Sequence, residues 1–501
     1  MYFLSYVGFF FNYEILIIHS MRKLQKIKTA KVLEMARTKK KGRGGKKSKR
    51  RLKGVSVRML QVWQPGVDGM EDGEELQFDP TAYDCLHAFH LGWPCLSFDI
   101  MRDTQGVLRT DFPHSLFCVA GTQADQPANN AVAVVQLANI TGQRRKPKIP
   151  STMEEDESES DSESDSDEED EDMETNPNQE SQSKVPLLQV RLVVHQGCVN
   201  RVRAMMQQPH IVATWGDSGY VQVWDMAAHI RSMSGGVPDG PGSCTTVHQA
   251  PLQIFTGHKD EGFALDWSPV TAGRLLSGDC KNAIHLWEPT TGGKWVVENK
   301  PFQGHSASVE DLQWSPTEAD VFASCSVDGT LRIWDTRHRE QSAISIKAHD
   351  ADVNVISWNR LASCMIASGC DDGTFRIWDL RSLKEDAFVA HFKYHTGAIT
   401  SIEWSPHEAS TLSVTSADHQ LTIWDLSLER DAEEEAEYQA LLKQQAEPPA
   451  DLPPQLLFVH QGQKDLKEGH WHPQIKDLLI ATAADGFNIL RPSNLENLPG
   501  A

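Results

Sequence analysis

Histidine and aspartate recur along this chain at a fixed spacing that could serve proton transfer or metal binding. Five histidines are each followed 29 residues later by a tryptophan: His195/Trp224, His258/Trp287, His305/Trp334, His349/Trp378 and His395/Trp424. In three repeats an aspartate (Asp328, Asp372 or Asp418) precedes the tryptophan by six residues. A histidine beside a carboxylate is a candidate acid–base or metal-ligand pair. Because the pair recurs in successive repeats, we expect instead buried groups that satisfy one another's hydrogen bonds.

Other features of the sequence argue against catalysis. It contains no nucleophile elbow, phosphate-binding loop or metal-spaced His/Cys cluster. The nine cysteines occur singly, which indicates neither a disulfide scaffold nor a zinc site and fits a reducing compartment. We therefore predict no enzymatic activity, no cofactor and no small-molecule substrate.

The elements that position these residues are predicted to be short antiparallel strands. Alternating runs such as 331–334 and 375–378 are typical of strands, and Asp328-Gly329 and Asp372-Gly373 of tight hairpin turns. Four strands in about 45 residues make one blade of a WD-repeat β-propeller. In each blade we expect the loop histidine, a strand Ser or Thr, the turn aspartate and the closing tryptophan to form one hydrogen-bonded chain. Lys281 replaces that aspartate in the third blade and Asp217 is displaced by one residue in the second, so both should lack the full network.

Seven blades are predicted, giving an all-β seven-bladed propeller with a short N-terminal helix and disordered charged insertions. A degenerate last repeat contains His460, Trp471, Asp485-Gly486 and Arg491. The opening blade lacks the signature, and its strands are expected at 94–100, 115–121, 132–137 and 188–194. Ring closure should use a segment from the other end of the chain, near 57–63. Residues 80–90 have apolar side chains at Ala82, Cys85, Leu86 and Phe89, which predicts a short amphipathic helix.

The domain boundaries follow from these segments. Residues 1–61 are expected to be a disordered basic extension, 62–92 an N-terminal segment with the helix, 93–491 the propeller and 492–501 a tail. Residues 2–19 are apolar, but Asn12 and Glu14 interrupt them and no basic residue precedes them, so no membrane segment is predicted. Met21 or Met35 could each begin a sensible protein, and residues 1–34 need not belong to it. An acidic insert is expected at about 141–184, and an acidic and proline-rich loop at about 428–454.

The acidic insert is the strongest candidate for partner binding. Fifteen of the twenty-one residues 154–174 are acidic and five are serine, within a chain of net charge −21. We expect a polyanionic clamp for basic proteins, while a solubilising loop is the alternative. The binding residues would be Glu154, Glu155, Asp156, Glu157, Asp167, Glu168, Glu169, Asp170, Glu171 and Asp172. Each serine has an acid three residues on, which predicts phosphorylation at Ser158, Ser160, Ser162, Ser164 and Ser166.

A basic block at residues 37–53 contains eleven Lys and Arg and no acid. It predicts a nuclear import signal or a tail, with direct nucleic-acid binding as the alternative. It has no aromatic residue on which bases could stack.

Two further segments carry a family resemblance. The chain resembles the histone-binding WD proteins related to retinoblastoma-associated chromatin factors at Tyr83-Asp84, at Leu86, and at residues 93–98 and 451–460. Within that superfamily, the chain is most similar to the glutamate-rich WD-repeat proteins. The similarity lies in residues 72–76, 262–267 and 308–314 and in the acidic insert. The resemblance implies a nuclear, largely nucleolar protein that chaperones a basic protein of the large ribosomal subunit and binds histones. It also implies a histone-facing groove around Tyr83, Leu86, Phe89 and Asp451.

An alternative function comes from the ends of two repeats. Residues 334–337 and 378–381 read Trp-Asp-x-Arg, the box that substrate receptors of cullin-type ubiquitin ligases carry. Arg337 and Arg381 would then contact the adaptor of a cullin-RING ligase.

Overall fold

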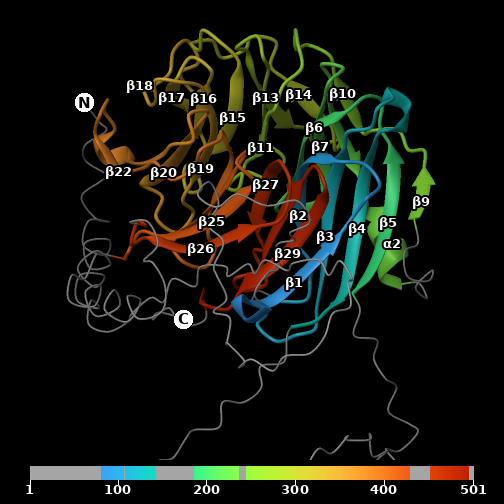
Figure 1. Cartoon of the computed structure of the whole chain (residues 1–501). Coiled ribbons are helices and arrows are strands. Elements are labelled where there is room, and N and C mark those ends of the chain that lie inside the picture. The colour runs from blue at the N-terminus through green and yellow to red at the C-terminus, as the bar shows by residue number, and fades with distance from the viewer. Residues whose placement is uncertain (1–79, 107, 143–185, 236–243, 429–451, 496–501) are drawn as a thin grey trace, which may run out of the picture.

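The structure is a computed structural model that describes residues 80–106, 108–142, 186–235, 244–428 and 452–495. These residues form seven β-sheets, and the innermost strands of the sheets neighbour one another in a closed cycle. The sheets therefore surround a central channel as the blades of a propeller (Figure 1). The predicted seven-bladed propeller is confirmed.

Each blade has an innermost, a second, a third and an outer strand, and neighbours within a blade are antiparallel. The innermost strands are β2 Cys95–Met101, β6 Val199–Met205, β11 Ala264–Trp267, β15 Val309–Trp314, β19 Val353–Trp358, β23 Ile399–Trp404 and β27 Leu466–Trp471. The second strands are β3 His114–Thr122, β7 Gln208–Gly216, β12 Leu275–Gly278, β16 Val321–Ser326, β20 Met365–Cys370, β24 Thr411–Ser416 and β28 Leu479–Ala483.

The remaining strands complete the blades. The third strands are β4 Ala131–Ile140, β8 Val221–Asp225, β13 Ile284–Pro289, β17 Thr330–Asp335, β21 Phe375–Asp379, β25 Gln420–Asp425 and β29 Gly486–Pro492. The outer strands are β5 Leu187–Val194, β10 Gln253–Phe255, β14 Trp295–Val297, β18 Ile344–Lys347, β22 Phe388–Phe392, β26 Leu456–Gln461 and, in the last blade, β1 Tyr83–Phe89. The four strands predicted for the opening blade coincide with β2 to β5.

The chain leaves the second blade between β8 and β10. It forms the helix α2 Ala227–Gly235 and then β9 Cys244–Val247, which pairs in parallel with β5 as a fifth strand of the first blade. Three short 3-10 turns complete the secondary structure, namely η1 Pro80–Ala82, η2 Pro127–Asn129 and η3 Leu380–Ser382. Among the described residues, no helix is long and apolar enough to cross a lipid bilayer.

The helix predicted at 80–90 is wrong, because only η1 is helical and Tyr83–Phe89 is the strand β1. Backbone pairing with β29, from Tyr83/Pro492 to Phe89/Phe487, makes this segment the outer strand of the last blade and outweighs the helical spacing of its apolar residues. The first and last strands of the described chain, β1 and β29, therefore lie side by side in one blade (Figure 1). A segment from the other end does close the ring, but it is 83–89, and the expected segment 57–63 lies outside the described residues.

The boundaries of the ring shift accordingly. It begins at Tyr83 instead of residue 93 and runs to Pro492. The tail expected from 492 begins later, because Leu495 is buried and the Asn494 side chain donates a hydrogen bond to the Leu457 carbonyl at 2.8 Å.

Large apolar side chains fill the spaces between neighbouring blades. In one such cluster Phe322 and Trp334 of the fourth blade lie with Leu276 and Leu286 of the third, and the closing tryptophans of five blades are at most 2% exposed. Truncating such a side chain to alanine leaves a cavity and costs about 3–5 kcal/mol.

The loops of a propeller lie on two faces. We call the face that carries the loops after the innermost and third strands the insertion face, because segments 143–185 and 429–451 both follow third strands, β4 and β25. The repeat histidines and hairpin turns lie on the opposite face, which we call the turn face.

Candidate functional site

The innermost strands are joined around the channel by hydrogen bonds from backbone amides to side chains of the preceding blade. From donor to acceptor, these are Ala204 N to Asp99 (2.8 Å), Trp314 N to Asp266 (2.7 Å), Trp358 N to Gln313 (2.7 Å), Trp404 N to Ser357 (3.2 Å), Trp471 N to Glu403 (2.7 Å) and Phe98 N to Glu468 (3.0 Å). A buried amide without a partner costs about 1–3 kcal/mol, so these side chains hold the blades in register.

A second series of tryptophans reinforces these joints. Trp267, Trp314, Trp404 and Trp471 end innermost strands, and each indole donates a hydrogen bond to a backbone carbonyl of the preceding blade at 3.0–3.2 Å. Three of the four follow their repeat histidine by nine residues. Trp358 has the same spacing from His349, but its indole donates to the Ser363 carbonyl of its own blade at 2.8 Å, so the spacing marks a contact between blades in three of four cases.

A buried ionic cluster lies where the first and last blades meet. The Glu468 carboxylate accepts hydrogen bonds from Ser97 Oγ (3.0 Å), Arg203 Nη2 (3.1 Å) and His470 Nε2 (3.2 Å), and it also pairs with Arg201. Burial opposes its charge, but the two arginines hold its pKa well below the usual value. The cluster joins the first, second and last blades, and sequence reasoning missed it because Glu468 lies more than 250 residues from Ser97, Arg201 and Arg203.

His470 is the cationic partner on the other side of this cluster. Its Nδ1 lies 3.2 Å from Glu403 Oε2. Burial would lower its pKa, but Glu403 and Glu468 raise the pKa of His470 to about 10, so the ring is charged at neutral pH.

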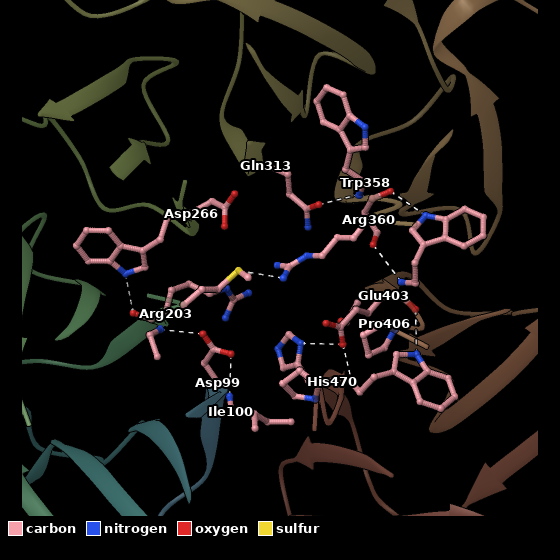
Figure 2. A pocket seen from close by; sticks show the side chains of 18 of the residues that line it. Asp99, Ile100, Arg203, Asp266, Gln313, Trp358, Arg360, Glu403, Pro406 and His470 are labelled. Atoms are coloured by element: carbon pink, nitrogen blue, oxygen red, sulfur yellow. Dashed lines mark hydrogen bonds and ion pairs between the residues drawn. The ribbon is translucent and has the colours of Figure 1, made fainter. Parts of the chain in front are cut away.

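These groups line a cavity of about 150 Å³ in the channel (Figure 2). Its cationic side chains are Arg102, Arg201, Arg203, Arg360 and His470, and its acidic ones are Asp99, Asp266, Asp311 and Glu403. Figure 2 shows the Arg360 side chain extending across the channel from the Trp358 side. The cavity is polar and small, so it suits one charged group of a partner better than an apolar ligand.

The predicted histidine networks are present in the fourth and sixth blades. His305 binds Asp328 (3.0 Å) and Ser324 (2.6 Å), and the Trp334 indole donates to the same serine (2.8 Å). In the sixth blade His395 binds Asp418 (3.0 Å) and Thr422 (2.9 Å), which also accepts from Trp424 (2.8 Å). These groups are buried and occupied with one another, as a structural role requires.

The second and third blades differ from each other. In the second, the ring of His195 binds the Gly197 carbonyl (3.0 Å) in place of an aspartate, as the displaced Asp217 predicts. In the third, the expectation of an incomplete network is wrong: His258 binds Asp279 (3.0 Å) and Ser277 (2.7 Å). The Asp279 carboxylate reaches the histidine from a position two residues before Lys281.

The fifth blade has a looser network. His349 Nε2 binds Ser368 (2.8 Å), which also accepts from the Trp378 indole (2.9 Å), but His349 Nδ1 meets Thr374 (3.4 Å), and it is Thr374 that binds Asp372 (2.7 Å). Side-chain atoms of His349, Cys370 and Asp372 lie within 4.8 Å of one another. Burial raises the pKa of the Cys370 thiol to about 12, so it remains protonated and is a poor metal ligand as it stands.

The histone-facing groove expected from the resemblance is not built as expected, because its helix is the strand β1. Tyr83 is buried and its hydroxyl binds His460 Nδ1 at 2.8 Å, while Phe89 stacks on Phe487 at 4.7 Å. Leu86 is half-buried against the same blade. These residues close the ring, and Asp451 lies outside the described residues.

The two Trp-Asp-x-Arg boxes lie in neighbouring blades, at the insertion-face ends of β17 and β21. The side chains of Arg337 and Arg381 are 57% and 49% exposed, and each pairs with the aspartate of its own box at 2.6 Å. Asp335 and Asp379 thus orient both guanidinium groups while leaving them accessible.

The acidic and phosphorylation residues predicted within 154–174 lie outside the described residues. Their anchors are described: β4 and β5 pair from Ala131/Val194 to Ala138/Leu187. The insert therefore leaves and re-enters one hairpin of the first blade.

Comparisons with known proteins agree with these features. The family of the "Histone-binding protein RBBP4", which includes the equivalent component of the CAF1 complex, matches residues 73–141. The family "WD domain, G-beta repeat" matches 297–335, 340–379 and 387–425. The chain is 61% identical to "Protein HEAT STRESS TOLERANT DWD 1" of Arabidopsis thaliana, over 92% of this chain and 97% of that protein.

Two further relatives are nearly as fully covered. Identity is 46% with "Glutamate-rich WD repeat-containing protein 1" of Dictyostelium discoideum, over 87% of this chain and 86% of that one. It is 40% with "Ribosome assembly protein rrb1" of Schizosaccharomyces pombe, over 86% and 84%.

Proposed function

This chain belongs to the glutamate-rich WD-repeat family, and from that premise we propose that it is a non-catalytic scaffold that escorts basic proteins during large-subunit ribosome assembly. Its client would be a basic ribosomal protein of the large subunit, and histones would be further partners, in the nucleus and nucleolus. The names of the Dictyostelium and fission-yeast relatives and the histone-binding match at 73–141 support this assignment.

The observation that carries the proposal is the attachment of the acidic insert. Fifteen acidic residues lie in one loop whose two ends are fixed in adjacent, fully paired strands of a closed ring. A polyanionic segment held on a rigid support raises the local concentration of negative charge, which attracts cationic segments and shields them from nucleic acid. Such binding weakens with salt, because exposed charges are screened beyond about 8 Å at physiological ionic strength.

Deletion of residues 154–174 tests the clamp. We expect affinity for a basic ribosomal protein, and for histones, to fall at least tenfold at low salt, with a smaller salt dependence. Deletion of residues 175–183 is the matched control, because it shortens the same loop by a stretch with one acidic residue. Equal client affinity in the two deletion variants would refute the clamp.

A second function is favoured by the exposed boxes. The 61%-identical relative is named a DWD protein, and Arg337 and Arg381 are oriented on one face. We propose that these arginines also contact the adaptor of a cullin-RING ubiquitin ligase. Arg337→Ala with Arg381→Ala should abolish co-purification of the adaptor, whereas Lys384→Ala, an exposed residue on the same loop, should not. Retention of the adaptor by the double variant would refute this role.

A further inference from the structure

One rim of the central channel differs between blades in a way that points to a ligand. Each innermost strand has one residue that pairs at the same register with its second strand, and these seven positions are therefore equivalent. They are Asp99, Arg203, Asp266, Gln313, Ser357, Glu403 and His470. Three residues after each, on the insertion face, the seven blades place Arg102, Met206, Pro269, Pro316, Arg360, Pro406 and Pro473. Proline ends the strand in four blades, and only two blades place a long cationic side chain there.

Both arginines line the cavity, and within the described residues neither forms an ion pair, although Asp99 acts on Arg102 and Asp266 on Arg360 through longer-range charge interactions. Arg102 and Arg360 line the cavity together with Met206, Pro406 and Pro473. Within the described part of the chain, Arg360 donates only to Met206 Sδ, at 3.0 Å, and Arg102 has no hydrogen bond or ion pair. A thioether is a weak acceptor, so neither guanidinium is satisfied by the protein.

The two charges also repel each other. Burial and then the charge of Arg360 lower the pKa of Arg102. The carboxyl groups deeper in the channel compensate only in part, because their oxygens accept backbone amides of the next blade. Burial raises the pKa values of Asp99 and Asp311, and it raises the pKa of Asp266 to about 7, so Asp266 is only partly charged at neutral pH. An anion between the arginines would relieve this repulsion.

Two guanidinium groups lining one cavity favour phosphate over carboxylate. One guanidinium fork satisfies both oxygens of a carboxylate, whereas a phosphate group has three oxygens and can accept from two forks on opposite sides. A cavity of about 150 Å³ has room for one such group. Figure 2 shows Arg360 reaching over this space. We propose that the Arg102–Arg360 rim binds a phosphate group, either free or on a phosphoserine peptide. This inference does not depend on the escort function.

Titration calorimetry on the full chain tests the site with three probes: pyrophosphate, a five-residue peptide with a central phosphoserine, and the same peptide without phosphate. We expect pyrophosphate or the phosphopeptide to bind the wild type, and which of them binds identifies the source. Arg102→Gln with Arg360→Gln should weaken that binding at least tenfold. Arg231→Gln, an exposed arginine on α2, is the matched control and should bind as the wild type does.

Three results would overturn the proposal: no binding of either phosphate probe to the wild type, equal binding to the double variant, or equal binding of the unphosphorylated peptide. Both side chains remain accessible to solvent although Arg102 is partly desolvated, and within the described residues neither forms an ion pair, so their replacement should leave the thermal midpoint nearly unchanged. A midpoint equal to wild type together with lost binding therefore separates a binding role from a folding role.

Discussion

Replacing Glu468 by glutamine removes the charge that joins the first, second and last blades while keeping the size of the side chain. Arg201 and Arg203 would then be buried cations without their main counter-charge. The NH2 group of the glutamine would also lie beside hydrogen-bond donors that the Glu468 carboxylate accepts from. Breaking a buried ion pair by removing one partner costs about 3–5 kcal/mol. For a ring of roughly 340 residues, an unfolding entropy of about 2.1 cal/mol/K per residue converts this loss into a thermal midpoint about 4–7 °C lower.

The assay is thermal and urea unfolding at neutral pH, with Glu298→Gln as the matched control. Glu298 pairs with Arg339 at 3.3 Å but its side chain is 44% exposed, so its loss should cost less than about 1 kcal/mol. The depressed pKa of Glu468 adds a test by pH: its stabilisation is present above the usual glutamate pKa and is lost as pH falls through the lowered folded value. Glu468→Gln should remove that part of the acid dependence. Equal midpoints for the two variants would refute the role given to the cluster.

Three other predictions concern the networks and the closure of the ring. Asp279→Asn should lower the free energy of unfolding by about 2–3 kcal/mol because a charged buried acceptor is lost, whereas Lys281→Ala should leave it nearly unchanged. A larger loss for Lys281→Ala in urea unfolding would contradict the assignment of Asp279 to the network. Tyr83→Phe removes the hydrogen bond to His460, so it should cost about 1–2 kcal/mol and speed amide exchange in β1, and unchanged exchange would argue against closure at this point. Burial, followed by the charge of Arg376, lowers the pKa of His349 to about 4. The unfolded chain therefore binds more protons than the folded one between pH 6.5 and 4, and the free energy of unfolding should fall as pH decreases across that window. His349→Asn should reduce this pH dependence in urea unfolding.

Much of the ring could be predicted because each blade repeats one local register. The 29-residue spacing from His305 to Trp334 joins the loop before the innermost strand to the end of the third, and this distance stays the same whenever strand and turn lengths do. Asp328-Gly329 and Asp372-Gly373 place a glycine at a positive φ of 74° or 80°, which a residue without Cβ adopts without strain. Local chemistry therefore specified strands and turns.

The errors arose where a local pattern allows two answers. Ala82, Cys85, Leu86 and Phe89 fit a helix and Tyr83, Cys85 and Phe89 fit a strand, and only the missing outer strand of the last blade decides between them. In the third blade the left-handed position is taken by Asn282, at φ 64°, and Asp279 replaces the serine found two residues before the turn aspartate in the fourth blade. The longer acidic side chain reaches the histidine from there, which spacing alone does not show.

The candidate sites were less accessible to prediction because they depend on neighbours far apart in the chain. The Arg102–Arg360 rim and the Glu468 cluster each combine residues from blades that are far apart in the sequence. Ring geometry alone brings them together.

Closure by β1 has a consequence for synthesis on the ribosome. Tyr83 emerges early, but its partners in β29 follow about 400 residues later, so at roughly 5–20 residues per second the first strand waits on the order of 20–80 s for its sheet. During that interval an unpaired edge is exposed at each end of an incomplete circle. A product that stops before β29 keeps both edges open, which exposes it to proteases that remove incomplete chains.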